Sequence, residues 1–168
     1  MAETVYILGA GASQHTGAPL TSGFYRRIRE IGTGQTVGEF EQDFRLVLDA
    51  YDRLARVHAK ADMKYRDNFE ELLASFELGA LLGRLGDMEE SEVTRLPDAL
   101  TRVIASTIER TMLYPLSPER VRMPHKAYLD FARHLAQKRA ETPSAVITFN
   151  YDLGLEVALR FANASWTY

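Results

Sequence analysis

Hydrophobic residues recur at two different spacings, and the difference separates the ends of the chain from its middle. Short apolar runs at residues 4–8 and 144–147 have the composition of buried strands. Each run is followed by a polar turn and then by helical periodicity, which in the second case carries Leu155, Val157, Ala158 and Phe161. The pattern therefore predicts a strand, a turn and a helix at each end of the chain.

The middle of the chain carries helical periodicity almost throughout. A first helix is expected to start at residues 19–22, to place Phe24, Ile28 and Ile31 on one face, and to end at residues 32–34. Four further apolar stripes at helical spacing follow: Phe40, Phe44, Val47, Leu48, Tyr51, Leu54 and Ala55; Phe69, Leu72, Leu73, Phe76, Ala80, Leu81 and Leu85; Leu100, Val103, Ile104, Ile108 and Met112; and Tyr128, Leu129, Ala132 and Leu135.

Two local features belong to this helical region. Asp67 or Asn68 is the predicted N-cap of the second of the four stripes. The acidic residues 86–90 are predicted to form a solvated loop.

The order of these elements argues against a doubly wound nucleotide domain, in which strands and helices alternate every ~30 residues. Between Gly17 and Thr148 nearly the whole chain is predicted to be helix. We therefore expect one α/β domain over residues 1–168, with strands from both chain ends and a large helical insertion at about residues 37–140.

The amino-acid composition excludes some classes of function and does not by itself assign one. The 168 residues are 46% hydrophobic and 26% charged, as is ordinary for a globular protein, and the net charge of -3 gives no basic surplus for nucleic acid. We interpret residues 26–29, a local basic stretch, as the solvent-facing side of a helix. Without cysteine the chain has neither a disulfide nor a thiolate metal site, and we expect no metal. No apolar run approaches the ~20 residues that span a bilayer, so a cytoplasmic protein is expected.

The first turn, after residue 8, is rich in glycine. Without Cβ atoms, Gly9 and Gly11 allow a phosphate to approach the backbone, and Ser13 adds a hydroxyl donor. The GxGxxG fingerprint fails because residue 14 is Gln, and no Gly-Lys-Ser/Thr follows as in a Walker A loop. The alternative is a tight turn without a ligand; the added spacing of Gly17 and Pro19 favours nucleotide binding.

The second turn carries Asn150 and Asp152 directly after the second strand. One interpretation gives Asn150 a left-handed turn position and Asp152 the cap of the next helix. The other places both side chains over a ligand pocket outside the carboxyl ends of the strands. The two roles of Asp152 are compatible with each other.

Together the two turns resemble the sirtuin superfamily, whose signature is Gly-Ala-Gly-x-Ser, three residues, Gly-x-Pro and a later Thr-Gln-Asn-Ile-Asp. The residues that match are Gly9, Ala10, Gly11, Ser13, Gly17, Pro19, Thr148, Asn150 and Asp152. Protein-deacetylating members continue with Asp-Phe-Arg, whereas residues 20–22 are Leu-Thr-Ser. That departure, the Asn-Tyr-Asp form and the helical insertion look like the sirtuin-like branch of bacterial anti-phage systems, which hydrolyses NAD to nicotinamide and ADP-ribose.

The resemblance implies a Rossmann-like three-layer core and an NAD site built from the matched residues together with Ala12. Residues 9–11 and Ser13 would hold the pyrophosphate and the adjoining ribose. Asn150 would position the nicotinamide ribose or the attacking water, and Asp152 would bind the carboxamide, so these two are the predicted catalytic residues. The family also uses a base histidine after the helix that follows Asp152.

No histidine follows Asp152 in this sequence. His15 either faces the pocket or is an exposed loop residue, while His125 and His134 are predicted on exposed helix faces. Because a nucleotide-binding sheet needs more than two strands, we expect the chain to be the N-terminal portion of a larger protein with an incomplete core.

Three functions remain open at this point. The first is an NAD hydrolase of the defence type, active or disabled in this chain. The second is a non-catalytic module that binds NAD or ADP-ribose, and the third, less favoured, is a protein-lysine deacylase. A second copy of the chain or a defence protein would be the partner, with no direct role for nucleic acid or membrane.

Overall fold

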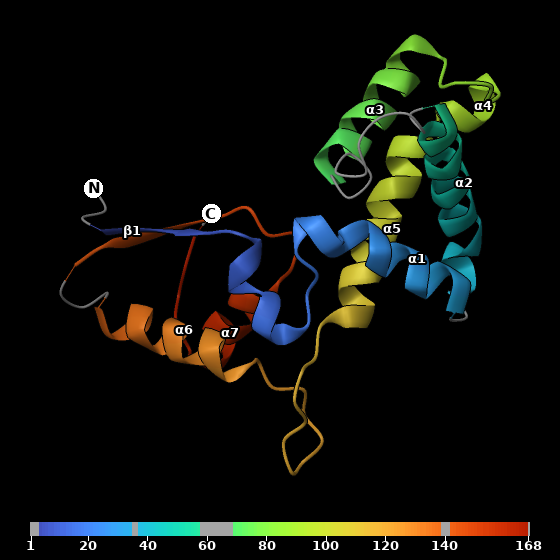
Figure 1. Ribbon diagram of the computed structural model, residues 1–168. Coiled ribbons are helices and arrows are strands. Elements are labelled where there is room, and N and C mark those ends of the chain that lie inside the picture. The colour runs from blue at the N-terminus through green and yellow to red at the C-terminus, as the bar shows by residue number, and fades with distance from the viewer. Residues whose placement is uncertain (1–3, 35–36, 58–68, 139–141, 168) are drawn as a thin grey trace. The chain divides into compact units, whose positions relative to one another are not determined.

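The computed structural model describes residues 4–34, 37–57, 69–138 and 142–167, and most of these residues are helical (Figure 1). The chain divides into two compact units. Both chain ends, Met1–Ala18 and Thr111–Tyr168, form the terminal unit, and Pro19–Arg110 forms the helical unit. The chain passes from one unit to the other twice, between residues 18 and 19 and between residues 110 and 111.

The terminal unit is organised by a parallel pair of strands. Strand β1 (Thr4–Leu8) pairs with β2 (Ser144–Thr148) in a register that sets Leu8 opposite Thr148. Both strands were predicted, as was their origin from opposite ends of the chain, and both predictions are confirmed. The described residues contain a two-stranded sheet, which fits the α/β class. The three-layer Rossmann-like core stays a prediction.

Helices α6 (Lys126–Lys138) and α7 (Gly154–Phe161) pack against each other and cover one face of this sheet (Figure 1). The strands contribute Tyr6, Leu8 and Val146 to the contact. The helices contribute the buried residues of the core, which are Tyr128, Ala132, Leu135, Leu155, Ala158 and Leu159.

The opposite face of the sheet is exposed, which corrects the prediction of two buried strands. Val5, Ile7 and Ile147 are 52%, 68% and 46% exposed. Successive side chains of a strand point to opposite faces, and in the described residues α6 and α7 pack against one face alone. The apolar composition of the strands was therefore a poor guide to burial on the second face.

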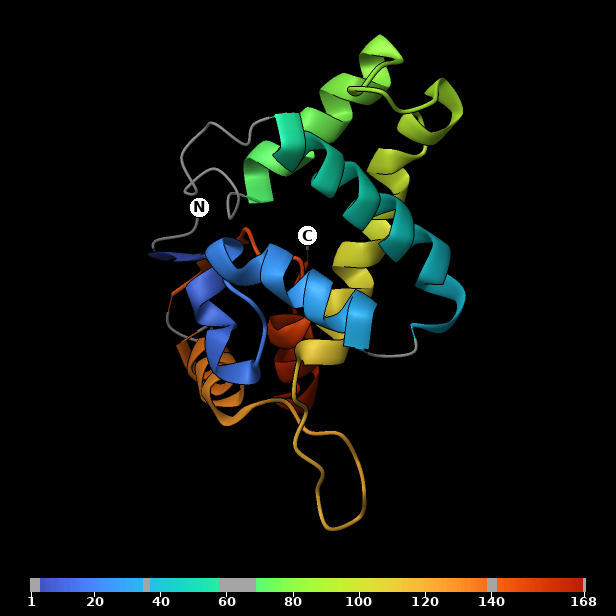
Figure 2. The same ribbon diagram turned by 45° about the vertical axis from the view of Figure 1, so that its right-hand side comes forward.

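The helical unit contains α1 (Phe24–Gly34), α2 (Glu41–Val57), α3 (Phe69–Leu82), α4 (Glu90–Val93) and α5 (Leu96–Thr111), the last of which ends in the terminal unit. Figure 2 shows these helices from a second side. Their inward faces form a core of their own, around the fully buried residues Ile28, Phe44, Val47, Phe76, Leu96, Leu100 and Val103.

The apolar stripes predicted these helices, apart from the following details. Helix α1 begins at Phe24, after a 3-10 turn at Thr21–Gly23, and not at residues 19–22 as predicted. Leu81 was predicted in the core, but its side chain is 82% exposed. Its position around the helix axis lies away from the buried side of α3. Within the acidic residues 86–90, Met88 is buried, and the short helix α4 begins at Glu90. Asp67 and Asn68, the predicted N-cap, lie outside the described residues.

A charge-assisted pair joins α2 to α5 inside the helical unit. The Arg102 guanidinium donates to both carboxylate oxygens of Asp43, at 2.8 and 2.9 Å. Asp43 is only 8% exposed, so this bidentate partner supplies the compensation that a buried carboxylate requires. No helix among the described residues is long and apolar enough to cross a membrane.

Gly17 is required by the backbone of the terminal unit. Its φ of +92° is left-handed, and a Cβ atom at this position would lie 2.4 Å from the carbonyl oxygen of Thr111. The neighbouring Leu113 N–H donates to the carbonyl oxygen of Thr16 at 2.6 Å, which holds the two segments together. The sequence assigned Gly17 to ligand binding, and the structure gives it a role in packing.

We therefore expect Gly17→Ala to lower the free energy of unfolding by about 1–3 kcal/mol, from left-handed strain and the displaced Thr111 backbone. Urea unfolding followed by circular dichroism measures the change. Gly11→Ala is the matched control, because a Cβ there meets nothing within 4 Å. Equal losses in the two variants would contradict the assignment.

Candidate functional site

The glycine-rich segment after β1 folds into two successive 3-10 turns, Ala10–Ala12 and Gln14–Thr16. The N–H groups of Ala12 and Ser13 donate back to the carbonyl oxygens of Gly9 and Ala10, at 2.8 and 3.2 Å. Ideal Cβ atoms built on Gly9 and Gly11 meet nothing within 4 Å. The backbone at these two glycines is thus open to close approach.

The second turn follows β2 and leads into α7. The Asn150 N–H donates to Thr148 Oγ1 at 3.1 Å, and Asp152 Oδ1 accepts from the N–H of Gly154, the first residue of α7, at 2.8 Å. The N-cap of α7 is Leu153, so the predicted cap position is wrong by one residue, although the Asp152 side chain accepts from the first N–H of the helix. The left-handed role of Asn150 is wrong, since Arg120 and Asn163 are the non-glycine residues with positive φ in the described ranges.

The side chains of the two turns meet at Ser13. Its hydroxyl donates to Asp152 Oδ2 in a short hydrogen bond and accepts from Asn150 Nδ2 at 2.8 Å. Ser13 is 1% exposed. These contacts join residues from the two predicted motifs, which are 137 and 139 positions apart along the chain. The other matched residues lie on the same turns, except Pro19, the first residue of the helical unit.

Tyr128 on α6 completes this group of side chains, called here the Ser13 network: Ser13, Asn150, Asp152 and Tyr128. The Tyr128 hydroxyl lies 2.6 Å from Ser13 Oγ and 3.5 Å from Asn150 Nδ2. Burial is the main cause that raises the pKa of Tyr128, so this hydroxyl stays protonated at neutral pH. Sequence reasoning placed Tyr128 in a core stripe and missed its polar role. The available signal was a tyrosine among leucine and alanine, because a buried tyrosine hydroxyl needs a partner.

Gly154 allows the Tyr128 ring to reach this position. A Cβ atom on Gly154 would lie 2.7 Å from Tyr128 Cε2 and 2.8 Å from Asp152 Oδ1. The absence of a side chain there lets ring and carboxylate converge at the start of α7. The motif comparison did not include this glycine.

Side chains of the second turn alternate between the network and solvent. Asn150 and Asp152 point into the Ser13 network, whereas Phe149, Tyr151 and Leu153 are 72%, 66% and 64% exposed. The alternation occurs in a bent segment, in which Tyr151 and Asp152 form the bend before α7. The turn therefore presents a polar row inward and an apolar row outward.

Two histidines lie beside the network. The His15 ring centroid is 4.3 Å from that of His125 and 5.4 Å from that of Tyr128. His125 precedes α6 and contacts His15, so its predicted place on an exposed helix face is wrong. His134 is exposed on α6, as predicted, with its Nε2 3.3 Å from the Tyr6 hydroxyl.

The surroundings of His15 favour its neutral form. Burial lowers its pKa most, and the neighbouring His125 lowers it further, whereas the Asp152 carboxylate opposes both effects. His15 is an exposed residue of the first turn, as one of the two sequence interpretations predicted, and its electrostatic neighbours are His125 and Asp152. No group of three or more metal-ligating side chains occurs among the described residues.

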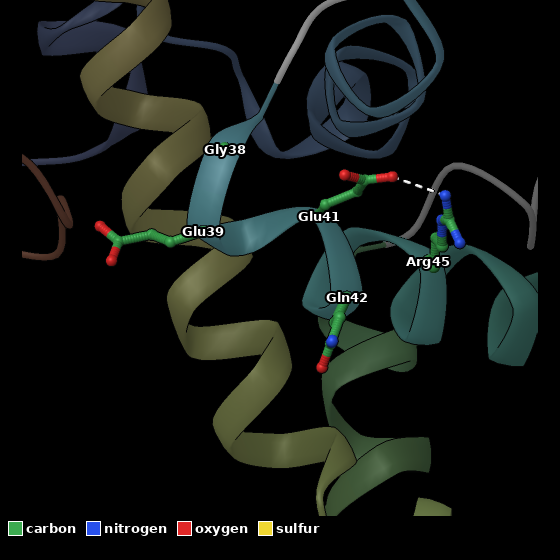
Figure 3. A pocket seen from close by; sticks show the side chains of 5 residues that line it. All are labelled: Gly38, Glu39, Glu41, Gln42 and Arg45. Atoms are coloured by element: carbon green, nitrogen blue, oxygen red, sulfur yellow. Dashed lines mark hydrogen bonds and ion pairs between the residues drawn. The ribbon is translucent and has the colours of Figure 1, made fainter.

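A separate hollow of about 340 Å³ lies on the helical unit, lined by Gly38, Glu39, Glu41, Gln42 and Arg45 (Figure 3). Glu41 and Arg45 form an exposed ion pair there at 2.5 Å, one helical turn apart. Such pairs contribute little to stability or recognition. Every member of the Ser13 network lies in the terminal unit, so this hollow is not the site that the sequence predicted.

Comparison of the chain with protein-family models, curated proteins and solved structures found no match. The candidate site is therefore defined by its own residues: two turns at one sheet edge, joined through Ser13 and Tyr128.

The His15 environment makes a prediction about titration. We expect the His15 Cε1–H resonance to titrate with a midpoint below 6.5, the ordinary pKa of a histidine side chain. His125→Gln should raise this midpoint by removing a like charge, and Asp152→Asn should lower it by removing a favourable one. Proton NMR between pH 4 and 8 measures all three proteins.

The sign for stability follows from linkage. A histidine whose folded pKa is depressed takes up a proton on unfolding, so its contribution to stability is complete above pH 6.5 and falls as the pH drops below that value. His15→Gln should flatten this part of the stability profile. A His15 midpoint at or above 6.5 in the unaltered protein would contradict the described environment.

Proposed function

We propose that the terminal unit carries the NAD site of a sirtuin-like NAD hydrolase, which cleaves NAD to nicotinamide and ADP-ribose. The single observation that carries the proposal is the Ser13 network. Ser13, Asn150 and Asp152 were selected from sequence as members of one NAD site, and their side chains hydrogen-bond to one another. Ser13 belongs to the first motif, whereas Asn150 and Asp152 belong to the second. Contact between the two motifs is what a single shared site requires.

Two features of the turns suit a dinucleotide. Open space over Gly9 and Gly11 would admit a pyrophosphate to the backbone. Asn150 Oδ1 is buried and takes no hydrogen bond within the part of the chain that the structure describes. A buried acceptor of this kind is normally satisfied by a donor, such as a ribose hydroxyl or a bound water.

The reaction requires neither a general acid nor a nucleophilic side chain. The bond between C1′ of the ribose and the nicotinamide nitrogen breaks, and its electron pair leaves with nicotinamide, which becomes neutral. The ribose centre acquires oxocarbenium character, as in glycoside hydrolysis. Water adds at C1′ and releases a proton, so the site must orient the ribose and the water. Asn150 and Asp152 are the residues proposed for this task.

The biological setting belongs to the same proposal and rests on the motif resemblance alone. It comprises a role in anti-phage defence, a location in the cytoplasm, and a second copy or a defence protein as partner. A Rossmann-like core built on the sheet and its helices is part of the same proposal.

A non-catalytic module for NAD or ADP-ribose is the second candidate. The observation that favours it is that the two side chains already have partners within the protein. Asn150 and Asp152 are hydrogen-bonded to Ser13, and Asp152 also accepts from Gly154. Residues that hold each other stabilise a turn as well as they would hold a ligand. Binding without turnover separates this candidate from the hydrolase.

The test is to incubate the chain with NAD and to follow nicotinamide by chromatography. We expect release that falls by about 10²–10³-fold in Asn150→Ala, the loss usual when one preorganised polar group is removed. Asn163→Gly is the matched control. It removes an exposed amide from a left-handed position, φ 51°, that glycine tolerates.

Calorimetric titration with NAD and ADP-ribose completes the experiment. Saturable binding without release by the unaltered chain would favour the binding module over the hydrolase. Neither binding nor release would refute both candidates.

A further inference from the structure

We propose that Ser13 and Tyr128 are positioning residues, which orient Asn150 and Asp152 and do not themselves contact the ligand. The inference rests on the proposed function and changes the role that the motif resemblance gives to Ser13. It follows from an account of the hydrogens and lone pairs in the Ser13 network.

A serine hydroxyl has one hydrogen to donate and two lone pairs that accept. The hydrogen of Ser13 goes to Asp152 Oδ2, and one lone pair accepts from Asn150 Nδ2. The Tyr128 hydroxyl, 2.6 Å away, must then donate to the second lone pair, since Ser13 has no hydrogen left for it. All three hydrogen-bonding positions of Ser13 are occupied by protein, and the side chain is buried at 1% exposure.

Tyr128 is the donor at one end of this series of hydrogen bonds. Its ring is buried at 4% exposure, packs against the bare backbone of Gly154 and lies beside the His15 ring. The raised pKa of Tyr128 keeps its hydrogen in place at neutral pH. A carboxylate can only accept, so the serine hydrogen points at Asp152, and the tyrosine fills the acceptor position of Ser13 that Asn150 leaves open.

The atoms left for a ligand are consequently those outside this closed set. They are the open backbone over Gly9 and Gly11, Asn150 Oδ1, which has no partner among the described residues, and the remaining lone-pair position of Asp152 Oδ1, which also accepts from the N–H of Gly154. On this view the hydroxyls of Ser13 and Tyr128 determine the orientation of the amide and the carboxylate, and so the rate, whereas ligand affinity comes from elsewhere.

The experiment compares Ser13→Ala, Tyr128→Phe and the double variant with the unaltered chain. Tyr128→Phe keeps the buried ring and removes only the hydroxyl. Tyr6→Phe is the matched control, because the Tyr6 hydroxyl also contacts α6, at His134, and does not belong to the network. The measurements are the affinity for ADP-ribose, the rate of nicotinamide release at saturating NAD, and the NMR signals of the Asn150 side-chain amide.

We expect each single variant to lower the release rate by about tenfold through misorientation, with less than a twofold change in ADP-ribose affinity. The double variant should lose no more than the slower single variant, because both break the same chain of bonds. The Asn150 amide signals should shift in Ser13→Ala and in Tyr128→Phe, and stay in place in Tyr6→Phe.

Three results would overturn the inference. A tenfold loss of ADP-ribose affinity in Ser13→Ala alone would make Ser13 a ligand contact. Multiplicative losses in the double variant would separate the two residues. Unmoved Asn150 amide signals in Tyr128→Phe would remove the coupling altogether. Should the unaltered chain release no nicotinamide, the hydrolase proposal fails, and the amide signals still decide whether Tyr128 orients Asn150, through Ser13 together with its own 3.5 Å contact to Asn150 Nδ2.

Discussion

The parallel pairing of β1 with β2 is the constraint on which the candidate site depends. Parallel strands end at the same edge of a sheet, so the turn after Leu8 and the turn after Thr148 leave side by side. An antiparallel pair in the same register would put the two turns at opposite ends of the strands, about 17 Å apart for strands of this length. The contacts of Ser13 with Asn150 and Asp152 depend on this one choice of direction.

Hydrogen-bond saturation then sets what the site can do. A buried hydroxyl that lacks a partner is costly, and Ser13 avoids the cost by binding Asp152, Asn150 and Tyr128. The same bonds that stabilise the turns remove Ser13 from direct contact with a ligand. Structural and functional interpretations of the second turn are therefore compatible, because Asp152 accepts both from the first N–H of α7 and from Ser13.

Predictability differed between the elements. Strands and long helices could be predicted, because each has a local signal in periodicity or in turn residues. The meeting of the two motifs was predicted from their shared place after a strand and from the motif resemblance. Tyr128 and Gly154 could not be assigned to the site, since their roles depend on how α6 and α7 pack. Apolar composition also failed to report that Val5 and Ile7 are exposed, because a strand does not encode whether a second layer covers it.

The sequence by itself determined the two turns and their residue types, since glycine, asparagine and aspartate have local backbone and capping preferences that need no distant partner. Only the tertiary structure decided that Ser13 is enclosed, that Tyr128 donates to it, and that His15 lies against His125. The physical reason is that hydrogen-bond partners are assigned by proximity in space. Proximity between residues more than a hundred positions apart is created by strand pairing and helix packing, and not by local sequence.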